Sequence, residues 1–146
     1  MNIKTLLGVS FMTAIVSLSS CSTSEKTISY KEAQRYFVRN DVTDHSPRII
    51  TNAEELRQYF GKATVMGTQG MPTFIDFDKY NAIAIIEPET NKDTEIHIES
   101  IKKQGDKIVV RYTSIESGES RSYKSVPFLL VKINKKYGDN VEFVKN

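Results

Sequence analysis

The sequence is poor in the residues that most often carry chemistry. It has one cysteine, Cys21, two histidines and no tryptophan among 146 residues. A single cysteine excludes an internal disulfide, so the stability of the chain must come from a packed core. Lys and Arg number 20 against 18 Asp and Glu. This near balance gives no electrostatic reason to expect a nucleic acid as partner.

The first 21 residues have the pattern of an export signal. Lys4 gives a short positive region, and residues 5–17 form an apolar stretch that suits a signal peptide and is too short to cross a bilayer. The run LSSC at 18–21 resembles the lipobox of bacterial lipoproteins. The resemblance implies cleavage after residue 20, lipidation of Cys21 and attachment to a membrane through the acyl groups. The alternative is an ordinary cleaved signal followed by a chance cysteine.

These observations predict a division of the chain into three parts. Residues 1–20 are expected to be a signal peptide. Residues 21–29 are expected to be a lipidated flexible tether, because the segment is small, polar and without apolar periodicity. Residues 30–146 are expected to form a single β-rich domain. Ser22, which is not aspartate, is compatible with an outer-membrane lipoprotein on the periplasmic face or the cell surface.

The downstream pattern predicts an α+β fold, in which a mostly antiparallel β-sheet of about seven strands forms a sandwich or an open barrel. One short N-terminal helix is expected at residues 52–60. Thr51 and Glu54 have the spacing of a capping box. Gly61 is placed for a left-handed residue after the helix.

Alternating and apolar runs predict the strands, with residues 81–86 as a central strand buried on both faces. Short connections predict mostly antiparallel pairing. Pro127 predicts a break in the long run before the last strand. The other strands are expected at 34–39, 74–77, 94–103, 107–114, 121–134 and 141–144.

Few residues suggest a reaction. Asp76 and Asp78 share a face of the predicted strand 74–77 and could serve as acid and base. The row Glu95, His97 and Glu99 contains ligand types that zinc accepts. Both patterns are also typical of strand ends and solvated strand faces. We therefore expect no enzyme activity, no metal and no cofactor, with an enzyme that uses Asp76, Asp78 or His97 as a third hypothesis.

Two loops are the candidate binding sites, because loops carry function more often than core strands do. Residues 62–73 place methionines beside glycines, which could form an adaptable contact surface. The alternative is a loop folded back over the edge of the core. Residues 88–94 form the second loop. The candidate binding residues are Met66, Gln69, Met71, Glu89, Asn91 and Lys92.

The order of segments from 51 to 134 resembles the C-terminal domain of the PrcB family, envelope proteins named for a protease-complex subunit. The matching pieces are ITNAEEL at 50–56, PTFIDFDKYNAIAI at 72–85, HIESIKKQGDKIVVRY at 97–112 and VPFLLVKI at 126–133. The resemblance implies a β-rich domain that acts by protein–protein contact, with protease association or inhibition. Where that family usually has a glycine-rich turn, this chain has EPETNKD at 87–93.

The first functional hypothesis is therefore a lipid-anchored, non-catalytic protein-binding module whose partner could be a protease. The alternative is an accessory lipoprotein that binds a small molecule or a glycan. Sugar rings stack on exposed aromatic side chains, so burial of the candidate rings would weaken this alternative. Those rings are Tyr59, Tyr80, Tyr112 and Tyr123.

Overall fold

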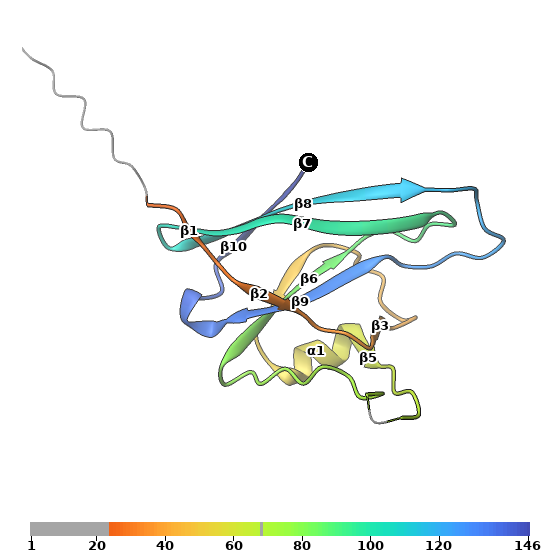
Figure 1. The fold of residues 1–146 in the computed structure, drawn as a ribbon, viewed down its shortest axis with the longest axis horizontal. Coiled ribbons are helices and arrows are strands. Elements are labelled where there is room, and N and C mark those ends of the chain that lie inside the picture. The colour runs from red at the N-terminus through yellow and green to blue at the C-terminus, as the bar shows by residue number, and fades with distance from the viewer. Residues whose placement is uncertain (1–23, 68) are drawn as a thin grey trace, which may run out of the picture.

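A computed structural model describes residues 24–67 and 69–146 of the chain (Figure 1). The predicted signal peptide and Cys21 lie outside the described residues. Within the described ranges, no helix has both the length and the apolar character needed to cross a membrane.

The described residues form ten strands, one α-helix and one 3-10 helix, η1. Their order is β1 (Lys26–Thr27), β2 (Tyr30–Glu32), β3 (Tyr36–Val38), β4 (Arg48–Ile50), α1 (Ala53–Tyr59), β5 (Phe60–Lys62), β6 (Tyr80–Ile86), β7 (Asp93–Gln104), β8 (Lys107–Ser117), β9 (Phe128–Asn134), η1 (Lys135–Tyr137) and β10 (Val141–Lys145). The mostly β fold with one short helix is confirmed. The number of strands was predicted too low, because the shortest strands have two or three residues and leave no periodic signal.

The strands of the described chain belong to three sheets. Sheet A has the order β1-β7-β8-β10, sheet B the order β2-β9-β6-β4, and sheet C pairs β3 with β5. None of these three sheets closes into a barrel, so the open-barrel form of the prediction is wrong. Figure 1 shows β7 and β8 on one side of sheet B and α1 on the other.

Sheet B is the middle layer, and each of its faces belongs to a different core. Ile83 and Ile85 of β6 pack in a cluster with residues of sheet A, such as Ile101. Ala82 and Ala84 of the same strand pack in a second cluster, which contains residues of α1, β3 and β5. The prediction that 81–86 is a central strand buried on both faces is confirmed.

The hairpin of β7 and β8 is the longest feature of the fold. Gly105 turns the chain with φ of 63°, in the left-handed region that favours glycine. The register shifts between Ile98 and Ser100, which marks a β-bulge. β1 pairs only with Lys102 and Lys103 of β7. Among the described residues, the outer edge of β7 from residue 93 to 100 therefore has no strand paired with it.

The last strand is the exception in a mostly antiparallel arrangement, which confirms the prediction of a mostly antiparallel fold. Among the described strand pairs, β10 and β8 are parallel and the others are antiparallel. Val141 and Phe143 pack against the core between sheets A and B in this arrangement. At the end of β10, the Lys145 Nζ donates to the Glu87 Oε2 at 2.7 Å, which ties sheet A to the loop after β6. Long-range packing, which a local pattern does not record, sets the direction of this strand.

The helix was predicted in the right place, but its ends are different. Asn52, not Thr51, caps α1, because the Glu55 amide donates to the Asn52 Oδ1 at 2.8 Å. The Thr51 amide donates to the Glu55 Oε2 at 3.1 Å, so the reciprocal capping arrangement lies one residue later than predicted. Gly61 does not end the helix in a left-handed conformation. It lies inside β5 opposite Phe37.

The folded domain begins earlier than predicted. Lys26 and Thr27 form β1, and Ile28 is 1% exposed. The Ile28 amide donates to the Ile101 carbonyl at 2.8 Å. The expected flexible tether over 21–29 is therefore wrong for residues 26–28, where a single isoleucine among polar neighbours enters the core.

Candidate protein-contact surface

The structure does not bring the two predicted binding loops together. The loop after β5 carries Met66, Gln69 and Met71, whereas the loop between β6 and β7 carries Glu89, Asn91 and Lys92. In Figure 1 the first loop, which includes the grey position 68, lies below α1, and the second lies beside sheet A. The two loops therefore need separate accounts.

The loop after β5 presents apolar side chains to solvent. Met66 is 106% exposed, Phe74 78% and Met71 71%. Val65 and, on the neighbouring strand β3, Phe37 are exposed as well. We call these five residues the methionine surface. The alternative prediction, a loop folded back over the edge of the core, is wrong for both methionines.

Hydrogen bonds hold both ends of this loop against the turn before β3. The Ala63 amide donates to the Arg35 carbonyl at 2.9 Å, and the Thr73 amide donates to the Gln34 carbonyl at 3.1 Å. The Tyr36 hydroxyl donates to the Thr73 carbonyl at 2.7 Å. Arg35 makes the turn with φ of 65°. The exposed methionines thus sit on a loop with fixed ends.

Glycine also shapes the middle of the loop. The Val65 amide donates to the Gly70 carbonyl at 3.1 Å, which draws the two sides together. A Cβ at Gly70 would lie 1.7 Å from the Val65 carbonyl oxygen, so no side chain fits there. Gly61 is likewise covered by the Phe37 ring, whose Cζ would lie 2.2 Å from an added Cβ. Two glycines therefore permit the close backbone approaches beside the methionine surface.

The loop between β6 and β7 has a different character, because its polar groups bond to its own chain. Thr90 and Ser125 exchange two backbone hydrogen bonds of 2.9 Å. Lys92 lies 3.8 Å from Glu116, and Glu89 lies 3.8 Å from Lys124. Arg121 donates to the carbonyls of this loop. The charged residues that were predicted to bind a partner thus form ion pairs within the chain, Lys92 with β8 and Glu89 with the segment before β9.

The proposed acid–base pair forms part of a turn. The predicted strand 74–77 is absent from the described structure, where this stretch is irregular. The Asp78 amide donates to the Asp76 Oδ1 at 3.1 Å, and the Tyr80 amide donates to the Asp76 carbonyl at 2.8 Å. Asp76 also lies 3.6 Å from the Lys79 ammonium. Its carboxylate thus organises the entry into β6, and the alternation of 74–77 reflects turn chemistry.

The predicted metal row lies on the solvated face of β7. The His97 Nε2 lies 3.1 Å from the Glu95 Oε2, and both side chains are exposed. Glu99 instead accepts a hydrogen bond from the Asn146 side chain. No group of three or more His, Cys, Asp or Glu residues within 24–67 and 69–146 is arranged to hold a metal ion.

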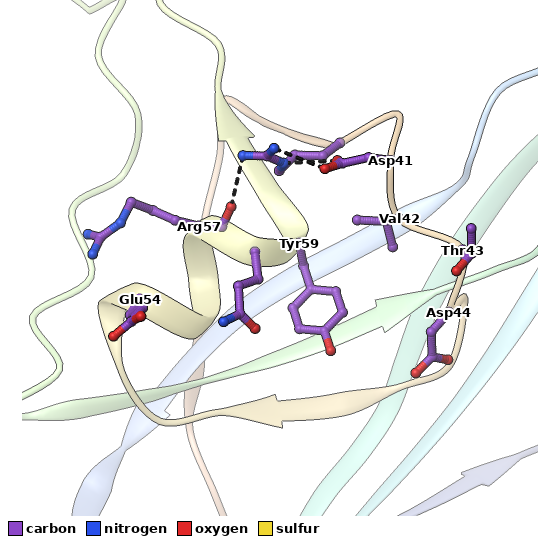
Figure 2. Close-up of a pocket in the computed structure, with 9 residues that line it drawn as sticks. Asp41, Val42, Thr43, Asp44, Glu54, Arg57 and Tyr59 are labelled. Atoms are coloured by element: carbon purple, nitrogen blue, oxygen red, sulfur yellow. Dashed lines mark hydrogen bonds and ion pairs between the residues drawn. The ribbon is translucent and has the colours of Figure 1, made fainter.

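A groove of about 610 Å³ lies between α1 and the segment 39–44. Figure 2 shows Glu54 and Arg57 pointing away from that segment, while the Tyr59 ring lies between it and the helix. The Arg39 guanidinium donates to both Asp41 oxygens at 3.0 Å. This bond lowers the pKa of Asp41 and raises that of Arg39. The charges of the groove pair with each other or diverge, so they do not form a convergent catalytic arrangement.

The four candidate tyrosines differ in exposure, and among them Tyr123 is the exposed one at 59%. Tyr112 is 4% exposed. Cations lie over the other three rings, with centroid distances of 3.9 Å from Arg48 to Tyr59, 4.7 Å from Lys132 to Tyr80 and 4.8 Å from Arg121 to Tyr123. One face of each of these rings is thus already occupied. This arrangement weakens the glycan-binding alternative.

No family model matches the chain, and no curated protein or solved structure matches it. The likenesses to the lipobox and to the PrcB C-terminal domain therefore stay predictions from the sequence.

Proposed function

We propose that this chain is a lipid-anchored envelope protein whose β-rich domain is a non-catalytic protein-binding module. The observation that carries the proposal is the methionine surface. Four exposed apolar side chains on one loop, with a fifth on the strand paired with β5, are typical of an interaction site. Methionine is flexible and polarizable, so it adapts to the shape of a partner.

The position of this surface suits a partner in the aqueous compartment. In Figure 1 the chain enters the domain at β1, at one end of the molecule, and the methionine loop lies toward the opposite end. If Cys21 is lipidated, the bilayer lies on the side of β1 and the methionine surface points away from it. A protease is the partner class that the PrcB resemblance implies. We propose the outer membrane as the location, on its periplasmic or external face.

The protein-binding proposal is tested by replacing three exposed side chains at once, Met66→Ser, Met71→Ser and Phe74→Ser. The full chain, solubilised from membranes, serves as bait for protein partners in an envelope extract. We expect recovery of the partner to fall at least about tenfold, because buried apolar contacts of this size each contribute about 1 to 2 kcal/mol.

A matched control removes exposed apolar area elsewhere. Ile115→Ser with Tyr123→Ser changes two exposed residues on β8 and in the segment before β9. This control should leave recovery unchanged. Equal recovery with the triple variant and the unchanged chain would refute the methionine surface as the contact site. Mass spectrometry of the mature N-terminus tests the anchor separately, and an unmodified Cys21 would remove it.

A further inference from the structure

Lysines from three separate elements gather around one tyrosine. The ammonium groups of Lys26 in β1 and Lys136 in η1 lie 5.9 Å and 5.1 Å from the centroid of the Tyr137 ring. The Lys103 Nζ, from β7, donates to the Tyr137 carbonyl at 2.7 Å. Residues more than a hundred positions apart in the chain therefore place positive charge at one end of the fold.

Further charges surround this cluster. Lys102, Lys107 and Lys135 lie on the same elements or next to them, and with Lys26, Lys103 and Lys136 we call them the lysine end. Nearby acids are Glu25, Asp106, Asp139 and Glu142. Lys102 bonds Glu25 at 2.8 Å and Lys107 bonds Glu142, which lowers the pKa of both carboxyls. Arg111 also acts on Glu25 and Glu142. Lys135 bonds the turn at Phe77 and Lys79, which adds Lys79, Asp76 and Asp78 to the count. Eight basic residues against six acids leave an excess of two positive charges.

The lysine end coincides with the place where the chain enters the domain. Figure 1 shows the start of β1, the turn between β7 and β8 and the turn after β9 at the same end of the molecule. Because β1 begins at Lys26, four residues separate Cys21 from the sheet. A chain of this length spans at most about 17 Å when fully extended. Electrostatic attraction in physiological salt extends over about 8 Å. A fully stretched linker therefore holds Lys26 beyond that range, whereas a bent linker of the same four residues brings it within reach of the bilayer surface.

We propose that the lysine end docks on an anionic bilayer surface, where its ammonium groups contact lipid phosphates. The inference rests on the lipid attachment in the proposed function and adds an orientation to it. Attraction between a basic surface and anionic lipid supplies a second membrane signal beside the acyl chains. Docking in this orientation would hold the methionine surface away from the bilayer.

The experiment uses the full acylated chain reconstituted into vesicles, with a dye that nitroxide lipids quench at close range. Asn140→Cys places the dye in the turn before β10. The Asn140 carbonyl accepts a hydrogen bond from the Ile108 amide of β8. Gln69→Cys places it on the methionine loop as the control position. Acylation of Cys21 leaves the introduced thiol as the only one to label. Vesicles contain either phosphatidylcholine alone or phosphatidylcholine with phosphatidylglycerol.

We expect quenching at position 140 to be strong in anionic vesicles and weak in neutral ones, and weak at position 69 in both. Each lysine near an anionic surface contributes roughly fivefold to binding. Lys26→Gln with Lys136→Gln should therefore lower the docked-to-undocked ratio roughly 25-fold. Lys62→Gln with Lys92→Gln, which removes two lysines outside the lysine end, should leave it unchanged.

Two failures are distinguishable. In the first, the protein floats with the vesicles, but quenching is equal in neutral and anionic lipid or does not respond to the Lys26 and Lys136 changes. This result overturns the docking alone. Protein whose Cys21 carries no acyl group and does not float overturns the anchor and the docking together. Recovery of a protein partner is measured separately and depends on neither result.

Discussion

The two faces of sheet B both pack in a hydrophobic core, but with different side chains. Toward sheet A, the face carries branched residues, such as Ile83, Ile85, Val131 and Ile133. Toward α1, the same strand β6 carries Ala82 and Ala84. The aromatic rings of Tyr36, Phe60 and Phe128 occupy this second core. The centroid of the Phe60 ring lies 6.5 Å from that of Tyr36 and 5.4 Å from that of Phe128.

The difference shows how one strand serves two kinds of neighbour. A facing sheet leaves room for large side chains from both layers, and branched residues fill it well. Ala82 and Ala84 on the other face leave space for the rings of Tyr36 and Phe60, which project from sheet C, while Ile86 of the same strand also packs in this core. Two small residues of β6 therefore match the large rings on one side, although both faces are equally apolar in the sequence.

The largest expected effect comes from a cavity on the side of sheet A. Ile85→Ala should lower the free energy of unfolding by about 3 kcal/mol, because Ile85 is fully buried and its neighbours can relax only in part. Urea denaturation followed by circular dichroism measures this loss. The same change at Ile115, which is exposed, should cost little. Similar losses at the two positions would contradict the assignment of Ile85 to the core.

A smaller effect should follow from adding volume on the side of α1. Ala84→Leu should destabilise by about 2 kcal/mol, because a fully buried alanine among aromatic rings leaves no space for a larger side chain. Denaturant midpoints are compared for two variants. Ala84→Leu adds volume and reports overpacking, whereas Ala84→Gly removes the methyl group and reports the loss of its contacts. Stabilisation by leucine would mean that this core contains unfilled space.

The smallest effect concerns pH and uses one tyrosine from each core. Burial raises the pKa of Tyr36 and, with a further contribution from Glu87, that of Tyr112. In the unfolded chain tyrosine ionises near pH 10. Below that pH the tyrosine contribution to stability is fully present, and it is lost as the pH rises from there through the folded pKa.

Thermal unfolding at increasing alkaline pH measures this loss. Tyr112→Phe should make the decline shallower, because phenylalanine cannot ionise. Tyr36→Phe should do the same and also lower stability at neutral pH, because the hydrogen bond to the Thr73 carbonyl is lost. An unchanged alkaline decline in both variants would show that other groups cause it.

The parts of the fold that were predicted correctly are those with strong local signals. The apolar run of β6 and the alternation of β7 before the turn at Gly105 identify the central strand and the long hairpin. The helix was also recognised, but Asn52 and Thr51 both suit a cap, and the choice between them depends on tertiary contacts. The parallel direction of β10 and the burial of Ile28 depend on distant partners.

For the candidate site, the exposure of the loop could be predicted from the sequence, and its role in binding stays a prediction. The methionines between glycines do form an exposed surface, as one of the two alternatives for 62–73 required. Phe37 and Phe74 belong to the exposed surface but were not among the predicted binding residues. Glu89 and Lys92 were predicted as binding residues, and they form ion pairs while their side chains stay about half exposed. Their ion-pair partners, Lys124 and Glu116, lie too far along the chain to be recognised from spacing.

The unpaired outer edge of β7 bears on how crowded copies of this protein behave. A long strand edge is a template on which another chain can form a ladder, and such contacts begin aggregation. Here the edge carries Asp93, Glu95 and Glu99, and the bulge beside Glu99 interrupts its regular spacing. Like charges on two approaching copies repel each other. The acidic residues along this edge of β7 therefore oppose strand-to-strand pairing between copies of the protein.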